Sequence, residues 1–293
     1  MPSRNLFLSL SIIACAVIAP FQCVIPSPAN THGANCGSIS GLSEAVASKK
    51  AGFLIFGELH GTSEIPAFIA DVVCQLSVDR PLVLALEFTR DDGRAVDDYI
   101  HSNSPKAAAN FLERGDWVDL PRDGRTSEAM LRMIVRLQQL VGAGRRLNVE
   151  GIIPQALNEK LSQNYYELGI ANELAGVASR HSEAMVVVLI GNVHARKSEM
   201  REYSLRPAAS LLPPTDVTSL RNSPTGGSAW YCQSDMCGEH AVTVDDKLPR
   251  GVALDAKKYT GYDGYFSVGE PYSASKPASP HSRIIDSDTV PIQ

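Results

Sequence analysis

Two acidic and two imidazole side chains carry the clearest chemical signal in this sequence. Glu58 and His60 lie two residues apart in the stretch Gly-Glu-Leu-His-Gly-Thr at 57–62, and Glu87 and His194 each follow another apolar run. Residues two apart in an extended chain share a face, so Glu58 and His60 should project together. A carboxylate beside an imidazole can orient the ring and let it act as a general base. We predict that these four residues are catalytic.

Short apolar runs precede these residues and predict the strands that position them. The runs are 53–56, 82–86 and 185–190, with a weaker fourth at 146–149. Continuous apolar runs are typical of strands that are buried on both faces, as in parallel sheets. Helical patterns alternate with them at 65–76, 127–141 and 156–179. This alternation predicts an α/β fold with a mainly parallel central sheet flanked by helices.

Ligands of open parallel sheets bind beyond the carboxyl ends of the strands, so we expect the four candidates to converge there. Arg90, Glu150 and Lys197 also follow predicted strands, and we assign them to substrate binding. Thr62 or Ser63 should cap the helix after the first strand and direct its free N–H groups to the same edge. Either that helix N-terminus or Arg90 would then hold an oxyanion.

Several common enzyme classes lack their signatures here. The sequence has no G-x-S-x-G elbow, no phosphate-binding P-loop, no dinucleotide-binding glycine motif and no H-E-x-x-H helix. The formal net charge is -5 and no long cluster of Lys and Arg occurs, which argues against nucleic acid as a partner. We therefore predict a small-molecule or peptide substrate. The predicted reaction is attack on an ester, lactone or amide carbonyl by a water that His60 activates.

Three motifs resemble those of the erythromycin esterase/ChaN-like superfamily, which also includes the Tiki and TraB proteins. They are the stretch 57–62, the acidic strand end at Glu87, and Gly-Asn-Val-His at 191–194. The resemblance spans roughly 53–212 and implies an α/β fold with both histidines and their carboxylates around one cleft. It also implies that His60 is the general base, that Glu58 or Glu87 orients it, and that His194 forms the opposite wall.

Members of this superfamily differ in function, so alternatives stay open. The esterase branch hydrolyses a macrolide lactone, but this chain is shorter than those esterases and lacks a large helical lid, so that substrate is not carried over. Tiki proteins are metal-dependent proteases, and the same two Glu and two His could hold a divalent metal here. ChaN binds haem without turnover. The hydrolase hypothesis requires no cofactor. ChaN-type haem capture uses a tyrosine, for which the unaligned candidates are Tyr99, Tyr165, Tyr166 and Tyr203.

The cysteines predict disulfides in an oxidising compartment. Beyond residue 29 the chain holds Cys36, Cys74, Cys232 and Cys237, an even number. The last two flank a turn-like connector, so we predict that they pair locally and that Cys36 pairs with Cys74. A zinc site is the weaker alternative, because the spacing matches no familiar zinc knuckle and His240 is the one extra ligand nearby.

The first residues resemble a secretory signal peptide. Arg4 precedes an apolar stretch at 6–19, and cleavage after Ala29 would suit a signal peptidase. We expect 1–29 to be removed and the mature protein to be periplasmic or extracellular, without a transmembrane segment. Lipid anchoring at Cys15 is the less favoured alternative, because this cysteine lies inside the apolar stretch.

The remainder is predicted to form one α/β domain at 30–270 that ends in a β-rich extension at 206–270. The short extended pieces in this extension should either add to the sheet or form a hairpin flap. They lie at 208–212, 217–220, 229–232 and 241–244. A Ser- and Pro-rich flexible tail is expected at 271–293.

Overall fold

The computed structural model describes most of the chain between residues 36 and 278. The described residues are 36–47, 52–102, 104, 107, 112, 113, 117, 123–154, 162–233 and 236–278. The predicted signal peptide, the alternative lipidation residue Cys15 and the stretch 279–293 lie outside them. Every described element belongs to the unit His32–Gln293.

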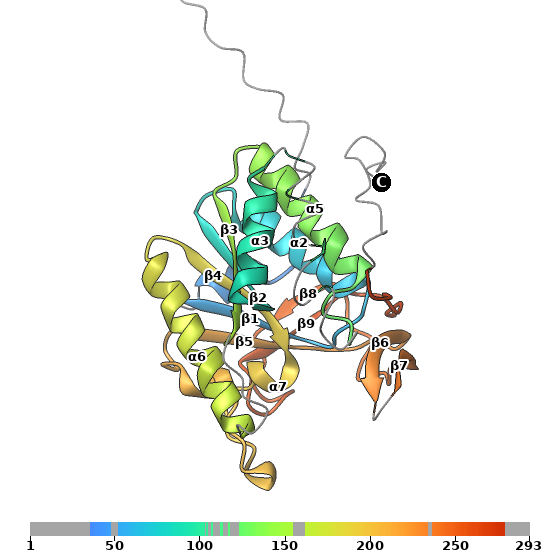
Figure 1. Ribbon diagram of the computed structural model, residues 1–293. Helices are drawn as coiled ribbons and strands as arrows, with labels where there is room; N and C mark the ends of the chain where they lie inside the picture. The colour runs from blue at the N-terminus through green and yellow to red at the C-terminus, as the bar shows by residue number, and fades with distance from the viewer. Residues whose placement is uncertain are drawn as a thin grey trace, which may run out of the picture. The chain divides into compact units, whose positions relative to one another are not determined.

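A seven-stranded sheet in the order β3-β2-β4-β1-β5-β9-β8 forms the centre of this unit (Figure 1). Its strands are β1 (Phe53–Glu58), β2 (Leu82–Thr89), β3 (Leu147–Ile153), β4 (Met185–Gly191), β5 (Val217–Asn222), β8 (Gly251–Ala253) and β9 (Gly264–Ser267). All neighbouring strands pair in parallel except β8 and β9, which are antiparallel. The predicted mainly parallel α/β fold is confirmed.

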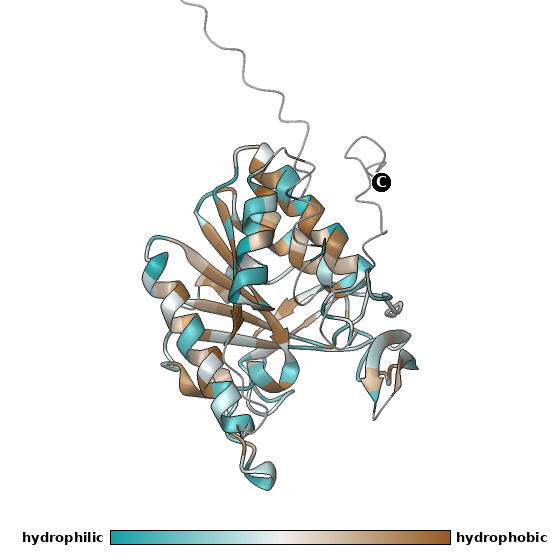
Figure 2. Cartoon of the chain, viewed as in Figure 1, coloured by the Kyte–Doolittle hydropathy of each residue, from teal (hydrophilic) through white to brown (hydrophobic). Residues whose placement is uncertain are grey.

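Helices cover both faces of the sheet (Figure 1). One face carries α1 (Leu42–Ala47), α2 (Glu64–Leu76), α3 (Arg90–Ile100) and α5 (Glu128–Gly142), and the other carries α6 (Gln163–Arg180), α7 (Asn192–Ala195) and the 3-10 helix η3 (Ala208–Leu211). A second 3-10 helix, η2 (Arg201–Tyr203), follows α7. Leu84 and Leu86 of β2 join one apolar cluster and Val83 and Ala85 the other, so burial on both faces explains the continuous apolar runs. Figure 2 shows these mostly hydrophobic strands between helices that carry both hydrophilic and hydrophobic residues.

Helix boundaries follow the predictions in part. The helices α2 and α5 match the predicted ranges closely, and α6 is described from Gln163 onward. Ser63 occupies the N-cap position of α2 but makes no side-chain cap hydrogen bond there, so the predicted cap is wrong. The helix α3 was not expected, because its run of Asp and Arg leaves only a narrow apolar stripe. Among the described residues, no helix is both long and apolar enough to cross a membrane.

The strand β3 is longer than predicted. The expected strand ended at residue 149, but β3 continues through Gly151 to Ile153 and pairs with β2 along its length. Ile152 and Ile153 are buried, so the apolar pattern resumes after Glu150. Glu150 therefore lies within the strand rather than beyond its carboxyl end.

The C-terminal extension takes both of its predicted forms. The strands β5, β9 and β8 add to the central sheet, while β6 (Ser228–Gln233) and β7 (Met236–Ala241) form a separate hairpin. Two of the four predicted pieces are wrong. The stretch 208–211 forms η3 after Pro207, and β7 ends at Ala241, because the pairing of Gln233 with Met236 places that strand earlier than 241–244.

The first part of the predicted tail is packed against the domain. Tyr272 is buried and pairs with Gly227, Ala274 pairs with Thr62, and Pro277 pairs with Ser127. These bridges hold 271–278 across the start of α2 and α5, so this part of the predicted tail is not free of the domain.

Both predicted disulfides are present. Cys36 is bonded to Cys74 of α2, and Cys232 of β6 is bonded to Cys237 of β7. Disulfides of this kind are typical of proteins in oxidising compartments.

The two disulfides should differ in their effect on stability. Replacing Cys36 and Cys74 together by Ala is expected to lower the free energy of unfolding by about 4 kcal/mol, because this bond closes a long loop in the unfolded chain. The bond between Cys232 and Cys237 closes a much shorter loop. Replacing these two cysteines by Ala should therefore lower the free energy of unfolding by only about 2 kcal/mol. Urea unfolding of both double variants measures the difference, and equal losses would contradict the prediction.

Candidate active site

The carboxyl ends of three adjacent strands bring the predicted acids and His60 together. Glu58 is the last residue of β1 and pairs with Gly191 of β4, and β4 lies between β1 and β2. The His60 Nδ1 atom lies 3.0 Å from Glu58 Oε1, and its Nε2 atom lies 3.6 Å from Glu87 Oε2. The glutamates are buried while about a fifth of the His60 side chain, 21%, is exposed, so solvent or a substrate can reach this imidazole.

His194 completes the group from α7, the short helix that follows β4. Its Nε2 atom lies 3.8 Å from Glu87 Oε1, so the Glu87 carboxylate faces an imidazole at each of its two oxygens. Glu58, His60, Glu87 and His194, hereafter the Glu/His cluster, thus converge as predicted at one end of the sheet. Their catalytic role stays a prediction.

Gly191 forms the floor of the Glu/His cluster. Its backbone N–H donates a 2.8 Å hydrogen bond to Glu87 Oε2. A Cβ atom at this position would lie 3.3 Å from His60 Nε2, 3.4 Å from His194 Cδ2 and 3.5 Å from Glu87 Oε2. A side chain here would therefore occupy the space that the three groups share.

The turn after His60 is held by segments from far along the chain. The Gly61 carbonyl accepts hydrogen bonds of 2.8 Å from the backbone N–H groups of Trp230 and Ser275. Gly61 has a φ of 69°, and a Cβ atom there would lie 1.8 Å from the Trp230 carbonyl oxygen. Glycine is therefore required at this turn, both for its conformation and for the close approach of the β6 backbone.

Glu167 of α6 belongs to the site but was missed from the sequence. It is fully buried and accepts from His194 Nδ1 at 2.8 Å and from the Ala208 N–H at 2.9 Å. It lies on the apolar stripe of its helix, together with Ile170 and Leu174. The sequence did contain a signal for Glu167, because it is a glutamate on an apolar helix stripe. Such a carboxylate is buried and needs a polar partner nearby.

Arg125 was also missed, and Tyr166 was named only as a candidate haem tyrosine. The Arg125 Nη1 atom lies 3.3 Å from Glu87 Oε1, and Asp123 fixes the same guanidinium at 2.9 Å. The Tyr166 ring meets the His194 ring edge-on with centroids 5.5 Å apart. Arg125 comes from the segment before α5, where no periodic pattern marks it.

Charge pairing in this site outweighs burial. Burial alone would lower the pKa of His60, but Glu87 and Glu58 raise it to about 9. Burial likewise opposes the raised pKa of His194, which its hydrogen bond with Glu167 and the charge of Glu87 produce. The pKa of Glu87 is lowered despite burial, because both imidazoles and Arg125 favour its charged form.

Two predicted substrate-binding residues lie in ion pairs outside the Glu/His cluster. Arg90 does not pair with Glu87; its Nη2 atom lies 2.6 Å from Glu173 of α6. Glu150 pairs with Arg180 at 3.1 Å and with His181 at 2.8 Å at the end of the same helix. Partners at or near a helix distant in sequence thus hold these two side chains outside the cluster.

Lys197 and the N-terminus of α2 are also engaged elsewhere. Lys197 Nζ lies 2.8 Å from Asp263 Oδ2 and 2.9 Å from the carbonyl of Val217, the first residue of β5, at the opposite end of that strand from the site. At the start of α2, the Ser63 N–H donates to the Ser273 carbonyl at 2.9 Å. Lys197 and the Ser63 N–H are therefore not directed at the Glu/His cluster.

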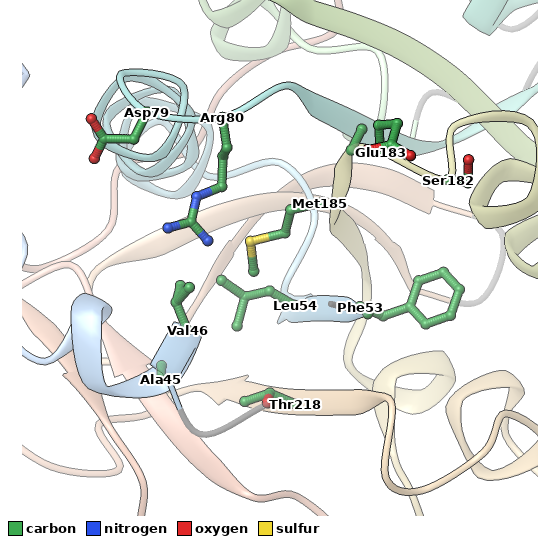
Figure 3. Close-up of a pocket in the computed structure, with 12 residues that line it drawn as sticks. Ala45, Val46, Phe53, Leu54, Asp79, Arg80, Ser182, Glu183, Met185 and Thr218 are labelled. Carbon is green, nitrogen blue, oxygen red and sulfur yellow. The ribbon is translucent and has the colours of Figure 1, made fainter. Parts of the chain in front are cut away.

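A cavity of about 320 Å³ lies at the other end of the sheet (Figure 3). Its walls include Phe53, Met185 and Thr218, which stand at the amino ends of β1, β4 and β5, together with Arg80 and Glu183. Because the Glu/His cluster stands at the carboxyl ends, this cavity is not part of the candidate active site.

Comparison with known proteins identifies the fold. No family model and no curated sequence matches the chain. A solved structure of a succinoglycan biosynthesis protein matches with a TM-score of 0.62 at 12% identity, covering 82% of this chain and 92% of that one. An erythromycin esterase, a mutant of EreC in its open conformation, matches with a TM-score of 0.51 at 10% identity, covering 82% and 90%. At the level of fold, the chain thus resembles erythromycin esterase, as its motifs predicted.

Proposed function

We propose that this protein is an exported hydrolase in which a water activated by His60 attacks an ester, lactone or amide carbonyl. One observation carries the proposal. The imidazoles of His60 and His194 are each held at Nδ1 by a buried carboxylate, and each directs Nε2 toward Glu87. Imidazoles fixed in this way have a defined tautomer and can transfer protons at Nε2. The two disulfides support export.

The proton path follows from this geometry. In neutral His60 the Nδ1–H group donates to Glu58, so the Nε2 lone pair faces the space above Gly191. A water bound there transfers a proton to Nε2 while its oxygen bonds to the carbonyl carbon. Glu58 stabilises the imidazolium that results. The proton then passes to the leaving oxygen or nitrogen as its bond to carbon breaks.

Arg125 and Tyr166 are the donors best placed for the negative charge that develops on the carbonyl oxygen. Both flank Glu87 and His194, whereas Arg90, the residue expected for this role, is paired with Glu173. Burial raises the pKa of Tyr166, so its hydroxyl stays protonated and can donate. Donors fixed in advance around a developing oxyanion are a large source of catalysis.

The raised pKa of His60 predicts that activity increases with pH. A general base acts only in its neutral form, and with a pKa of about 9 roughly 1% of His60 is neutral at pH 7. The kcat/KM should therefore rise about tenfold per pH unit below pH 8 and level off near the pKa. Glu58→Gln removes a charge that raises this pKa, so the rise should shift to lower pH and the plateau should fall.

Steady-state kinetics from pH 5 to pH 10 on an ester substrate would measure both effects. Glu150→Gln is the matched control, because it removes the charge of a carboxylate that contacts a different imidazole, His181. This control should keep the wild-type profile. A kcat/KM that stays constant from pH 6 to pH 9 would argue against His60 as the base. A pH profile that is the same in wild type and Glu58→Gln would do so as well.

A divalent metal is the second candidate, and one observation favours it. Histidines that bind a metal through one nitrogen commonly donate the other to a carboxylate, as His60 and His194 do here. The positions themselves do not fit. Within the described part of the chain, no three His, Cys, Asp or Glu side chains are placed to hold a metal ion. The Arg125 guanidinium 3.3 Å from Glu87 also brings a competing positive charge.

A further inference from the structure

A second group of charged side chains surrounds a cavity of about 580 Å³ outside the Glu/His cluster. The chain as a whole has a formal net charge of -5, yet three cations and a single acid line this cavity. The charged and aromatic lining residues are Arg196, Arg221, Lys258, Asp245, Tyr259 and Tyr262. The cavity is thus locally positive on an acidic protein.

Arg196 is the cation of this group without an acidic partner. Its Nε atom donates to Ser198 Oγ at 3.1 Å, and no carboxylate of the described residues lies within ion-pair distance of its guanidinium. Gly261 has a φ of 92°, and a Cβ atom there would lie 2.9 Å from Arg196 Nε. The Arg196 side chain therefore packs against Gly261. Its terminal N–H groups are available to donate hydrogen bonds to a ligand.

The other two cations are held in place around Tyr259. Arg221 pairs with Asp245 at 2.8 Å and lies over the Tyr259 ring at 4.4 Å from its centroid. Lys258 pairs with Asp246 at 2.8 Å and lies 5.4 Å from the same centroid. The two acids offset both of these charges, so Arg196 carries the positive charge of the cavity that no acid in the described part of the chain offsets.

Tyr262 places the two arginines near one another. Its hydroxyl donates to the Asn192 carbonyl at 2.7 Å, which anchors it to the start of α7. Burial raises the pKa of Tyr262, while Arg221 and Arg196 act to lower it. Tyr262, Arg196 and Arg221 line the same cavity.

We propose that this cavity binds a small molecule through its anionic group, a carboxylate or a phosphate, with Arg196 as the main contact. A guanidinium donates two parallel hydrogen bonds to such groups, and these charge-assisted bonds are stronger than neutral ones. The cavity volume suits a small-molecule ligand rather than a lone ion. The proposal does not depend on hydrolysis, because no lining residue belongs to the Glu/His cluster.

Isothermal titration calorimetry of the full chain with inorganic phosphate and, separately, with citrate tests this site. Wild-type protein should bind at least one of the two saturably, and Arg196→Gln should weaken that binding about tenfold or more. Arg90→Gln is the matched control, because this arginine pairs with Glu173 outside the cavity, and it should bind as wild type does. Asp245→Asn removes the lining acid and should strengthen binding.

Tighter binding of phosphate would indicate that the ligand carries a phosphate group. Tighter binding of citrate would indicate a ligand with carboxylate groups. Thermal unfolding of each variant shows whether it is folded, and Asp245→Asn provides an independent test if Arg196→Gln is not. The proposal is overturned if neither anion binds wild-type protein. It is also overturned if Arg196→Gln and Arg90→Gln bind alike, or if Asp245→Asn weakens binding.

Discussion

His60→Ala is expected to lower kcat by about 10²–10⁴-fold, the range that a positioned general base contributes. Glu87 keeps its contacts with Arg125 and the Gly191 N–H, and loss of the partly exposed imidazole opens the buried Glu58 to water, so the variant should stay folded. A panel of ester, lactone and peptide substrates, assayed on wild type and variant side by side, measures the loss.

His181→Ala provides the control for His60→Ala. His181 also contacts a carboxylate, Glu150, at 2.8 Å, but it lies at the end of α6, away from the Glu/His cluster. Its removal should leave kcat unchanged. Activity that survives a chelator and disappears in His60→Ala supports the proposed mechanism, and loss to the chelator alone favours the metal candidate. Undiminished activity in His60→Ala would exclude this histidine as the base.

Glu167→Ala is expected to destabilise the protein by about 2–4 kcal/mol and to reduce activity as well. The carboxylate is fully buried, and its loss leaves the Ala208 N–H group and His194 Nδ1 without their acceptor. The freed imidazole also loses its orientation toward Glu87. Urea unfolding measures the first effect, and kcat on the best substrate measures the second.

Glu173→Ala is the control on the same helix. It removes a carboxylate that pairs with the exposed Arg90 and should cost about 0–1 kcal/mol.

The effect of Glu167→Ala should also depend on pH. Glu167 raises the pKa of His194, so its contribution is fully present below pH 6.5 and is lost as the pH rises through the raised value. A destabilisation that grows between pH 6 and pH 9 would contradict this pairing.

The sequence was informative where local rules decide the structure. The strands that precede Glu58, Glu87 and His194 are buried on both faces, which leaves an unbroken apolar run that is visible without the fold. The two-residue period of an extended chain then places Glu58 and His60 on one face. The convergence of these groups follows from parallel pairing, which collects the carboxyl ends of the strands at one edge.

The residues that surround these groups could not be found in the same way. Arg125 reaches Glu87 from a segment without periodicity, and Glu167 reaches His194 across the gap between two helices. Arg90 and Lys197 were misplaced because a long flexible side chain pairs with whichever acid the tertiary structure brings near. Tertiary packing, which spacing along the chain does not specify, determines all four of these contacts.

The hydrogen bonds at Gly61 have a consequence for biosynthesis. Polypeptides emerge from the ribosome N-terminus first, and domains form as their residues become available. The turn that carries His60 is made early, but its carbonyl is bound by the backbone of Trp230 and Ser275, which are synthesised near the end. A nascent chain that already contains all members of the Glu/His cluster therefore still lacks the support for this turn. Synthesis through Ser275 must therefore precede assembly of the site.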